Sequence, residues 1–313
     1  MRAWQRVFVL FIFCGAPAFV LGQMDNLPTG SSAPAPAATT NSNPSLPSAP
    51  LSQDQIKDLI KQVADNDDKN DKKQRDYTYI EREVETKLDG KGQAKSTETK
   101  TYEILEIYGD QVQRLVAKDN KPLSAKDVAK EDEKIQSIID KRKNETEKQR
   151  EKRLRAEEKD REESRQWVHE ISEAYNFHEV DIEKVGGREA WVITAEPRPG
   201  FVPHLKYANY LSKFHGRVWI DKADLEVSKM DVECLDTVSW GLFLARFHKG
   251  SRITLEQTRV NDEVWLPLYL SLKLDARLAL LKGLKLEEEQ TFSDYKKFRT
   301  DTRIVGVGEV REK

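Results

Sequence analysis

The stretch Val264–Arg277, VWLPLYLSLKLDAR, contains the clearest residue pattern in this chain of 313 residues. From Leu268 to Ala276 every second residue is apolar. A period of two is typical of a β-strand with one buried face and one solvated face. The intervening residues, which would occupy the solvated face, are Tyr269, Ser271, Lys273, Asp275 and Arg277.

Comparable segments, separated by short turns, precede and follow this stretch. Eleven strands are predicted, at 77–84, 97–108, 111–118, 177–185, 188–196, 214–220, 225–234, 239–248, 253–260, 264–277 and 284–298. A sheet of this length curls because its strands twist. We therefore predict an α+β protein built on a curved, unclosed antiparallel β-barrel, arranged as a meander, with capping helices.

Two segments have helical patterns. Ser52, three residues before Gln55, predicts a capping box and a short amphipathic helix that runs to about Asp65. A helical insertion is predicted at 124–175, beginning at Ser124. Within it, 19 of the 25 residues from 141 to 165 are charged, so we expect that part to project from the body as an arm or hairpin.

The N-terminal region predicts export. Arg2 and Arg6 precede an apolar run that ends in small residues, which is the pattern of a signal peptide; cleavage is expected after Gly22. A retained membrane anchor and lipidation at Cys14 are the alternatives. Residues 23–50 hold six of the twelve prolines and predict a disordered linker, which leaves 51–313 as the folded domain with its helical insertion.

Charge and cysteine content exclude some classes of protein. The 52 basic and 54 acidic residues leave a net charge of −2, which disfavours nucleic-acid binding. Cys234 is the only cysteine outside the predicted signal peptide, so no intrachain disulfide is expected. The mature protein is expected to be periplasmic or secreted.

No pattern predicts catalysis, a metal or a cofactor. The five histidines are scattered, without the close pairs that metal sites use. Glu287, Glu288 and Glu289 are consecutive on a predicted strand, so their side chains alternate between faces instead of facing each other. The sequence contains no nucleophile elbow and no phosphate-binding loop. We therefore expect a protein that is not an enzyme.

Aromatic and leucine residues are the candidates for a ligand-binding surface. A filled core uses the same residue types as an apolar cavity, so simple packing of these side chains is the alternative. The candidate cavity-lining residues are Trp191, Trp219, Trp240, Phe243, Trp265, Leu268, Leu270, Leu272 and Leu274.

Four short motifs carry a family resemblance. They are Phe214–Asp221 (FHGRVWID), Leu225–Asp231, Val264–Pro267 (VWLP) and Phe292–Phe298 (FSDYKKF). In this order they resemble the LolA-like outer-membrane lipoprotein-sorting proteins, most of all an uncharacterised branch from soil bacteria. The resemblance implies an unclosed half-barrel, capped by helices, that carries acyl chains across the periplasm.

The leading hypothesis is an exported carrier or chaperone that binds lipid acyl chains or a lipoprotein in an apolar cavity, with transient membrane contact. The alternative is an envelope scaffold that binds a protein partner through the charged arm.

Overall fold

The computed structural model describes residues 50–108, 110–205, 208–240, 245–278, 283–297, 302–306 and 309–312. The chain divides into two compact units, Met1–Pro50 and Leu51–Lys313. Because the described residues begin at Pro50, the predicted signal peptide and the rest of the predicted linker lie outside them. Everything below concerns the second unit.

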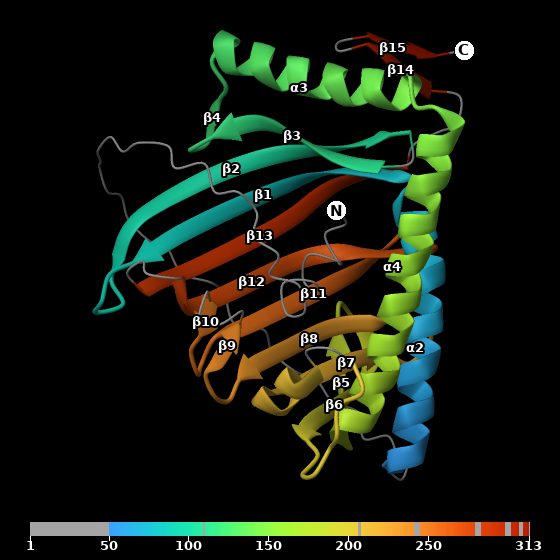
Figure 1. Ribbon diagram of the computed structural model, residues 1–313, viewed down its shortest axis with the longest axis vertical. Helices are drawn as coiled ribbons and strands as arrows, with labels where there is room; N and C mark the ends of the chain where they lie inside the picture. Colours follow the sequence, from blue (N-terminus) through green and yellow to red (C-terminus); the bar gives the residue numbers. More distant parts are fainter. Residues whose placement is uncertain are drawn as a thin grey trace. The chain divides into compact units, whose positions relative to one another are not determined.

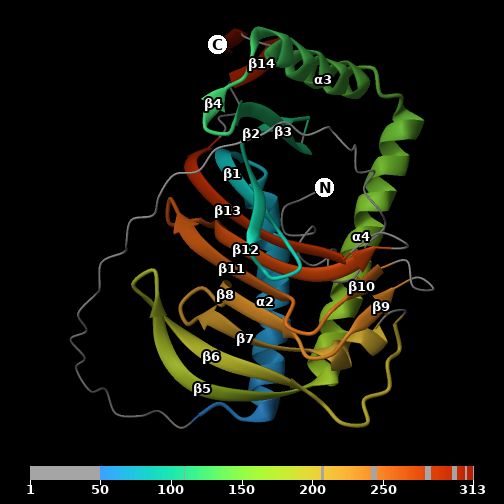
Figure 2. The same cartoon turned by 90° about the vertical axis from the view of Figure 1, so that its left-hand side faces the viewer.

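A single antiparallel sheet dominates this unit (Figure 1). Its strands lie in the order β4-β3-β2-β1-β13-β12-β11-β8-β7-β6-β5, and the short strands β9 and β10 branch from β12. The sheet is curved (Figure 2), and it is not closed, because two different strands, β4 and β5, form its ends. The predicted α+β fold class is confirmed. The strands are β1 (Tyr77–Leu88), β2 (Ala94–Ile107), β3 (Asp110–Lys118), β4 (Lys121–Pro122), β5 (Tyr175–Val185), β6 (Arg188–Pro197), β7 (Phe214–Asp221), β8 (Val227–Cys234), β9 (Val238–Trp240), β10 (Ala245–Phe247), β11 (Arg252–Val260), β12 (Val264–Leu278) and β13 (Gly283–Lys297).

The predicted meander occurs as two runs that meet at one long-range strand pair. Strand β1, near the start of the domain, pairs with β13 along almost its whole length, from Tyr77–Lys297 to Leu88–Lys285. No local pattern in either strand specifies this pairing. Sequence reasoning also missed β4 and the separate two-stranded sheet of β14 (Thr302–Gly306) and β15 (Glu309–Glu312).

Gly216, in the FHG motif, is required by the close approach of two strands. A Cβ atom at this position would lie 2.9 Å from the main-chain oxygen of Asp231 on β8. Contact at that distance with backbone forces the strands apart, so any side chain here disturbs the β7–β8 pair.

Helix α2 (Gln53–Gln74) begins as predicted, with a capping box in which the Ser52 hydroxyl and the Gln55 side chain each accept the other residue's main-chain N–H. Its predicted end near Asp65 is wrong. The last turns are polar and show little of the apolar periodicity that predicts a helix. In the structure, Asn70 and Gln74 both donate hydrogen bonds to the main-chain oxygen of Trp265. A tertiary contact extends this helix.

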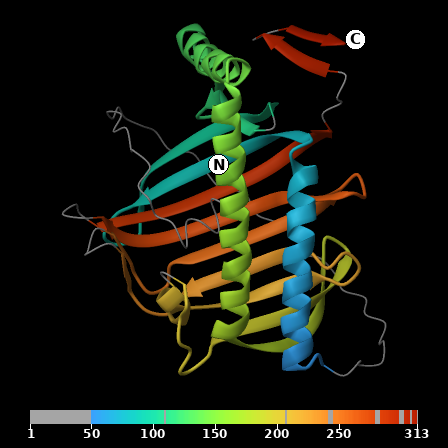
Figure 3. The same cartoon turned by 45° about the vertical axis from the view of Figure 1, so that its right-hand side comes forward.

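The insertion forms helices α3 (Ala125–Lys143) and α4 (Glu147–Ala174). Helix α3 packs Ile135 and Ile139 against Ile107 of β2. Helix α4 runs beside α2 and contacts β5 (Figure 3), and none of the described side chains in the predicted arm, residues 141–165, is buried. Its N-terminal half is mostly exposed, whereas Trp167 and Ala174 near its C-terminus are buried. The predicted short helix near 205–211 is a 3₁₀ helix at Ala208–Lys213.

The main core cluster holds α2 on the sheet. Ile56 and Leu59 of α2 pack with Phe177 of β5, Ile193 of β6 and Ile220 of β7. These strand residues define what we call the helix side of the sheet, and the opposite face is the outer side. Side chains alternate between the two sides along each strand.

Ile56→Ala is expected to lower the free energy of unfolding by about 2–5 kcal/mol, because Ile56 is 0% exposed and its removal leaves a cavity. Ile182→Ala, the same change at an exposed position on β5, is expected to cost less than about 1 kcal/mol. Urea unfolding of the two variants checks this. Equal losses would show that α2 is not held by this core.

Candidate functional site

The helix side of the sheet carries a stripe of leucines next to the helix-packed core. Leu270 and Leu272 of β12 face Leu255 and Ile253 of β11, and Leu274 faces Leu286 of β13. Leu255 in turn pairs with Met230, and Met230 with Val218, which belongs to the α2 core cluster. The alternation predicted from the sequence therefore places Leu270, Leu272 and Leu274 on the side that α2 contacts.

Burial varies along this stripe. Ile253, Leu255 and Leu286 are buried, whereas Leu270, Leu272 and Leu274 are half-buried. The three leucines therefore keep apolar surface that the described residues do not cover completely. Leu268 is 43% exposed and lies where the β11–β12 register shifts, opposite Glu256 and Gln257.

A strip of carboxylates borders the leucine stripe at β13. Leu272 pairs with Glu288, which pairs with Glu85 of β1, and Glu83 and Glu81 follow on the same side. Burial, followed by the mutual proximity of Glu83 and Glu288, raises the pKa of Glu83, and burial raises the pKa of Glu288. The Lys100 ammonium lies 3.8 Å from Glu83 and 2.8 Å from Glu98. The carboxylates therefore border the stripe beside Leu272, whereas at Leu270 the apolar surface continues through Phe292 of β13 to Tyr79 of β1 and Ile104 of β2.

The tryptophans predicted to line a cavity lie on different surfaces. Trp191 packs with the α2 core on the helix side. Trp219 lies on the outer side, where it pairs with Val192, and its Nε1 donates to Glu183 at 2.8 Å. The cationic groups of Arg217 and Lys229 lie 5.8 and 5.3 Å from its ring centroid. The structure thus separates Trp219 from the leucine stripe, because successive residues of a strand face opposite ways.

Two further members of the predicted set cannot be placed on a surface. Trp240 ends strand β9, and its side chain lies outside the described residues. Phe243 lies outside them entirely.

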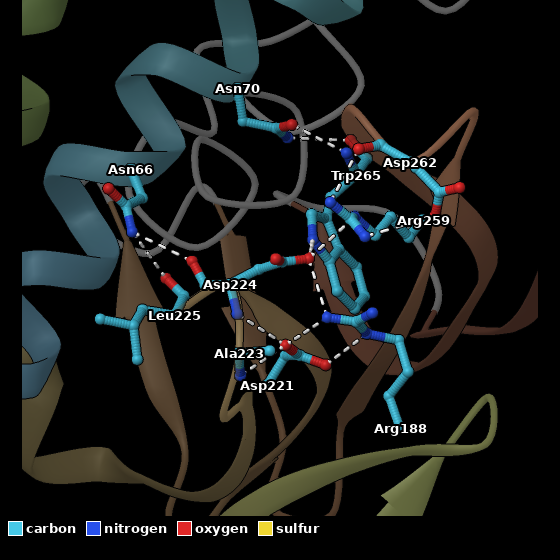
Figure 4. Close-up of polar contacts among 10 residues, drawn as sticks. All are labelled: Asn66, Asn70, Arg188, Asp221, Ala223, Asp224, Leu225, Arg259, Asp262 and Trp265. Atoms are coloured by element: carbon cyan, nitrogen blue, oxygen red, sulfur yellow. Dashed lines mark hydrogen bonds and ion pairs between the residues drawn. The ribbon is translucent and has the colours of Figure 1, made fainter.

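Trp265 belongs to a polar junction between α2 and the sheet (Figure 4). The Asn70 side chain accepts from its main-chain N–H and donates to its main-chain oxygen, both at 2.8 Å. Its indole Nε1 donates to Asp224 Oδ2 at 3.0 Å, and the Arg188 guanidinium lies 5.5 Å from its ring centroid. Trp265 therefore connects the helix to the sheet instead of lining an open surface.

Asp221, the last residue of the FHGRVWID motif, is the anionic centre of this junction. Arg188 donates to its two carboxylate oxygens at 2.7 and 2.8 Å, and the N–H groups of Ala223 and Asp224 donate to Oδ1. Burial opposes ionisation of Asp221, but these hydrogen bonds and the Arg188 charge prevail and lower its pKa. The Asp221 carboxylate thus fixes the β7–β8 turn.

Asp224 completes the junction from the same turn. Its Oδ2 accepts from Arg188 and Arg259, each at 2.9 Å. Asn66 of α2 donates to the main-chain oxygens of Asp224 at 3.1 Å and Leu225 at 3.3 Å. The two motifs WID and VWLP, which are 46 residues apart at their tryptophans, therefore meet under α2.

Sequence reasoning missed four of these residues: Asn66, Asn70, Arg188 and Arg259. Asn66 and Asn70 are one helical turn apart, and that spacing, just beyond the predicted end of the helix, was an available signal. Arg188 and Arg259 each stand among mostly polar or small residues, so nothing in the sequence indicated that their side chains bind these carboxylates.

The described residues contain no group of three or more His, Cys, Asp or Glu side chains placed to hold a metal ion. Cys234 is buried, its thiol donates to the main-chain oxygen of Asp236, and burial raises its pKa. In the described part of the chain, no helix has the length and apolarity needed to span a bilayer.

Comparisons with known proteins return structural neighbours only. No family model and no curated protein matches the sequence. An outer membrane lipoprotein-sorting protein domain from Vibrio parahaemolyticus is 13% identical, with a TM-score of 0.30 and coverage of 78% of this chain and 95% of that one. A DUF1329 family protein from Desulfovibrio piger is 11% identical, with a TM-score of 0.29 and coverage of 77% and 92%. A LolA superfamily protein from Nitrosomonas europaea is 8% identical, with a TM-score of 0.24 and coverage of 76% and 93%.

Asp221→Asn is expected to lower the free energy of unfolding by about 1–3 kcal/mol at pH 7, because it removes the charge that Arg188 and the turn amides bind. Because the pKa of Asp221 is lowered on folding, the wild-type advantage exists above the unfolded value of about 3.9 and disappears as the pH falls through the folded value. Glu287→Gln, which breaks an exposed pair with Lys273, should cost less than about 1 kcal/mol. Denaturant unfolding at pH 7 and below pH 4 tests both. A pH-independent difference would contradict the assignment.

Proposed function

We propose that this protein is an exported, non-enzymatic carrier or chaperone that binds acyl chains of a lipid or lipoprotein on the helix side of its sheet. The observation that supports this most directly is the half-buried stripe of Leu270, Leu272 and Leu274, which continues the α2 core without being fully covered by it. The predicted signal peptide supports an extracytoplasmic location.

Acyl binding needs only apolar contact. Each methylene group transferred from water to such a surface contributes about 0.8 kcal/mol, so two or three chains provide useful affinity without a catalytic group. The stripe adjoins Ile253 and Leu255, which are buried and extend the apolar surface onto β11. The guest's chains would lie along β11 and β12, beside the helices.

A scaffolding role through the charged helix is the second candidate. The exposed charges of α4 include the pairs Glu151–Arg155 and Lys159–Glu163 within the helix itself. Charges that neutralise each other in this way offer a partner little net attraction. The leucine stripe therefore favours the carrier over the scaffold.

Leu272→Asp is expected to weaken binding of a fluorescent acyl probe by at least about tenfold, because it places a charge in the proposed acyl contact. Ser271→Asp is the matched control, since it adds the same carboxylate one residue away on the outer side. Probe titration followed by fluorescence measures both. Equal affinities in the two variants would contradict binding on the helix side.

The natural guest can be tested independently of any probe. Protein purified from its native envelope is expected to release acyl species on solvent extraction, and the Leu272→Asp variant is expected to release far less. Mass spectrometry of the extract reads this out. Wild-type protein that carries no acyl species would overturn the proposal.

A further inference from the structure

Glu226 is a buried acid that the junction described above does not use. It follows Leu225 and directly precedes β8, and it is 6% exposed. Its main-chain oxygen accepts from the N–H of Asp221, but its carboxyl group has no hydrogen-bond or ion-pair partner among the described residues. A buried carboxylate without a partner is strongly disfavoured.

Glu226 lies where α2 docks on the sheet. The preceding main-chain oxygens, those of Asp224 and Leu225, accept the Asn66 side chain of α2 (Figure 4). On the side of β11, Gln257 donates to the main-chain oxygen of Val227, the residue after Glu226. Glu226 is therefore a buried residue flanked in the chain by residues that α2 and β11 bind.

The charges around Glu226 are mixed. Asp67 of α2 and Asp224 of the turn disfavour its ionisation, whereas Lys73 and Lys69 of α2 favour it. Arg188 and Arg259 form their ion pairs with Asp224 and not with Glu226. Burial is the largest effect, followed by Asp67 and Asp224, and together they raise the pKa of Glu226 to about 8.

We propose that Glu226 is a proton-operated latch: α2 stays docked on the β7–β8 turn while this carboxyl is protonated, and it is released as the carboxyl ionises.

The direction follows from linkage. With the helix undocked, Glu226 would be solvated and would titrate near the ordinary value of about 4.3. Below that pH both states are protonated, so docking is strongest and independent of this group. Between pH 4.3 and the docked pKa of about 8, each pH unit weakens docking about tenfold. Above that pKa, Glu226 is ionised in both states and docking weakens no further.

The latch has a consequence for the apolar face. Helix α2 covers Ile193 and Ile220 next to the leucine stripe, so its release exposes further apolar surface on the helix side. The idea that this newly exposed surface admits or releases a guest rests on the proposed function. The latch itself does not, and it is measured without any ligand.

Hydrogen exchange of α2 tests the latch in the full chain. From pH 5.5 to 7.5, the protection of α2 amides in Glu226→Gln relative to wild type is expected to rise about 100-fold, because the uncharged amide keeps the helix docked. The intrinsic exchange rate cancels in this ratio. Glu233→Gln, at the other end of β8, should follow wild type at every pH.

A ratio that stays constant across this range overturns the proposal, as does a Glu233→Gln variant that behaves like Glu226→Gln. Asp67→Asn provides a second test should Glu226→Gln not fold. Removing this acidic neighbour lowers the pKa of Glu226, so the pH at which α2 protection stops falling should move below that of wild type. An unchanged end point contradicts the latch. Loss of the pH dependence with intact acyl binding would separate this proposal from the carrier function.

Discussion

The docking of α2 on the sheet depends on one buried ionic contact, the Asp221 carboxylate bound by Arg188 and by two amides of its own turn. This contact fixes the β7–β8 turn, whose main-chain oxygens accept hydrogen bonds from Asn66. Without a fixed turn, Asn66 would lose its partners on the sheet, and α2 would keep only the contacts of Asn70 and Gln74 with Trp265 at this end. The helix, the turn and β12 therefore form one cooperative unit.

The junction divides the helix into two functional halves. The N-terminal half of α2 is held by Ile56 and Leu59, whose burial is insensitive to pH. The C-terminal half is held by Asn66, Asn70 and Gln74, which are directional contacts that a nearby charge can weaken. The directional contacts are therefore the part of the α2 attachment that responds to a nearby charge, and the apolar contacts are the part that becomes exposed if the helix leaves the sheet.

The two sides of the sheet differ in how their acidic side chains are paired and buried. On the outer side, charges such as Arg252–Asp231 and Lys229–Glu256 pair across strands and remain near water. On the helix side Glu83 and Glu288 are half-buried, and beside the β7–β8 turn Glu226 is buried; the pKa values of all three are raised. Glu83 and Glu288 lie beside the leucine stripe, so their ionisation links the proposed binding face to pH.

The sequence alone determined the elements whose information is local. Alternation in Val264–Arg277 was sufficient to predict β12 and to group Leu270, Leu272 and Leu274 on one face, and Ser52 with Gln55 marked the start of α2. It could not determine which strands pair at long range, so the β1–β13 junction and the merging of two meanders were not foreseen. Nor could it show that Trp219 faces away from the leucines, or that polar residues 66–74 stay helical. Those outcomes depend on strand register and on partners up to 195 residues distant, such as Asn70 and Trp265, and only the folded chain brings them into contact.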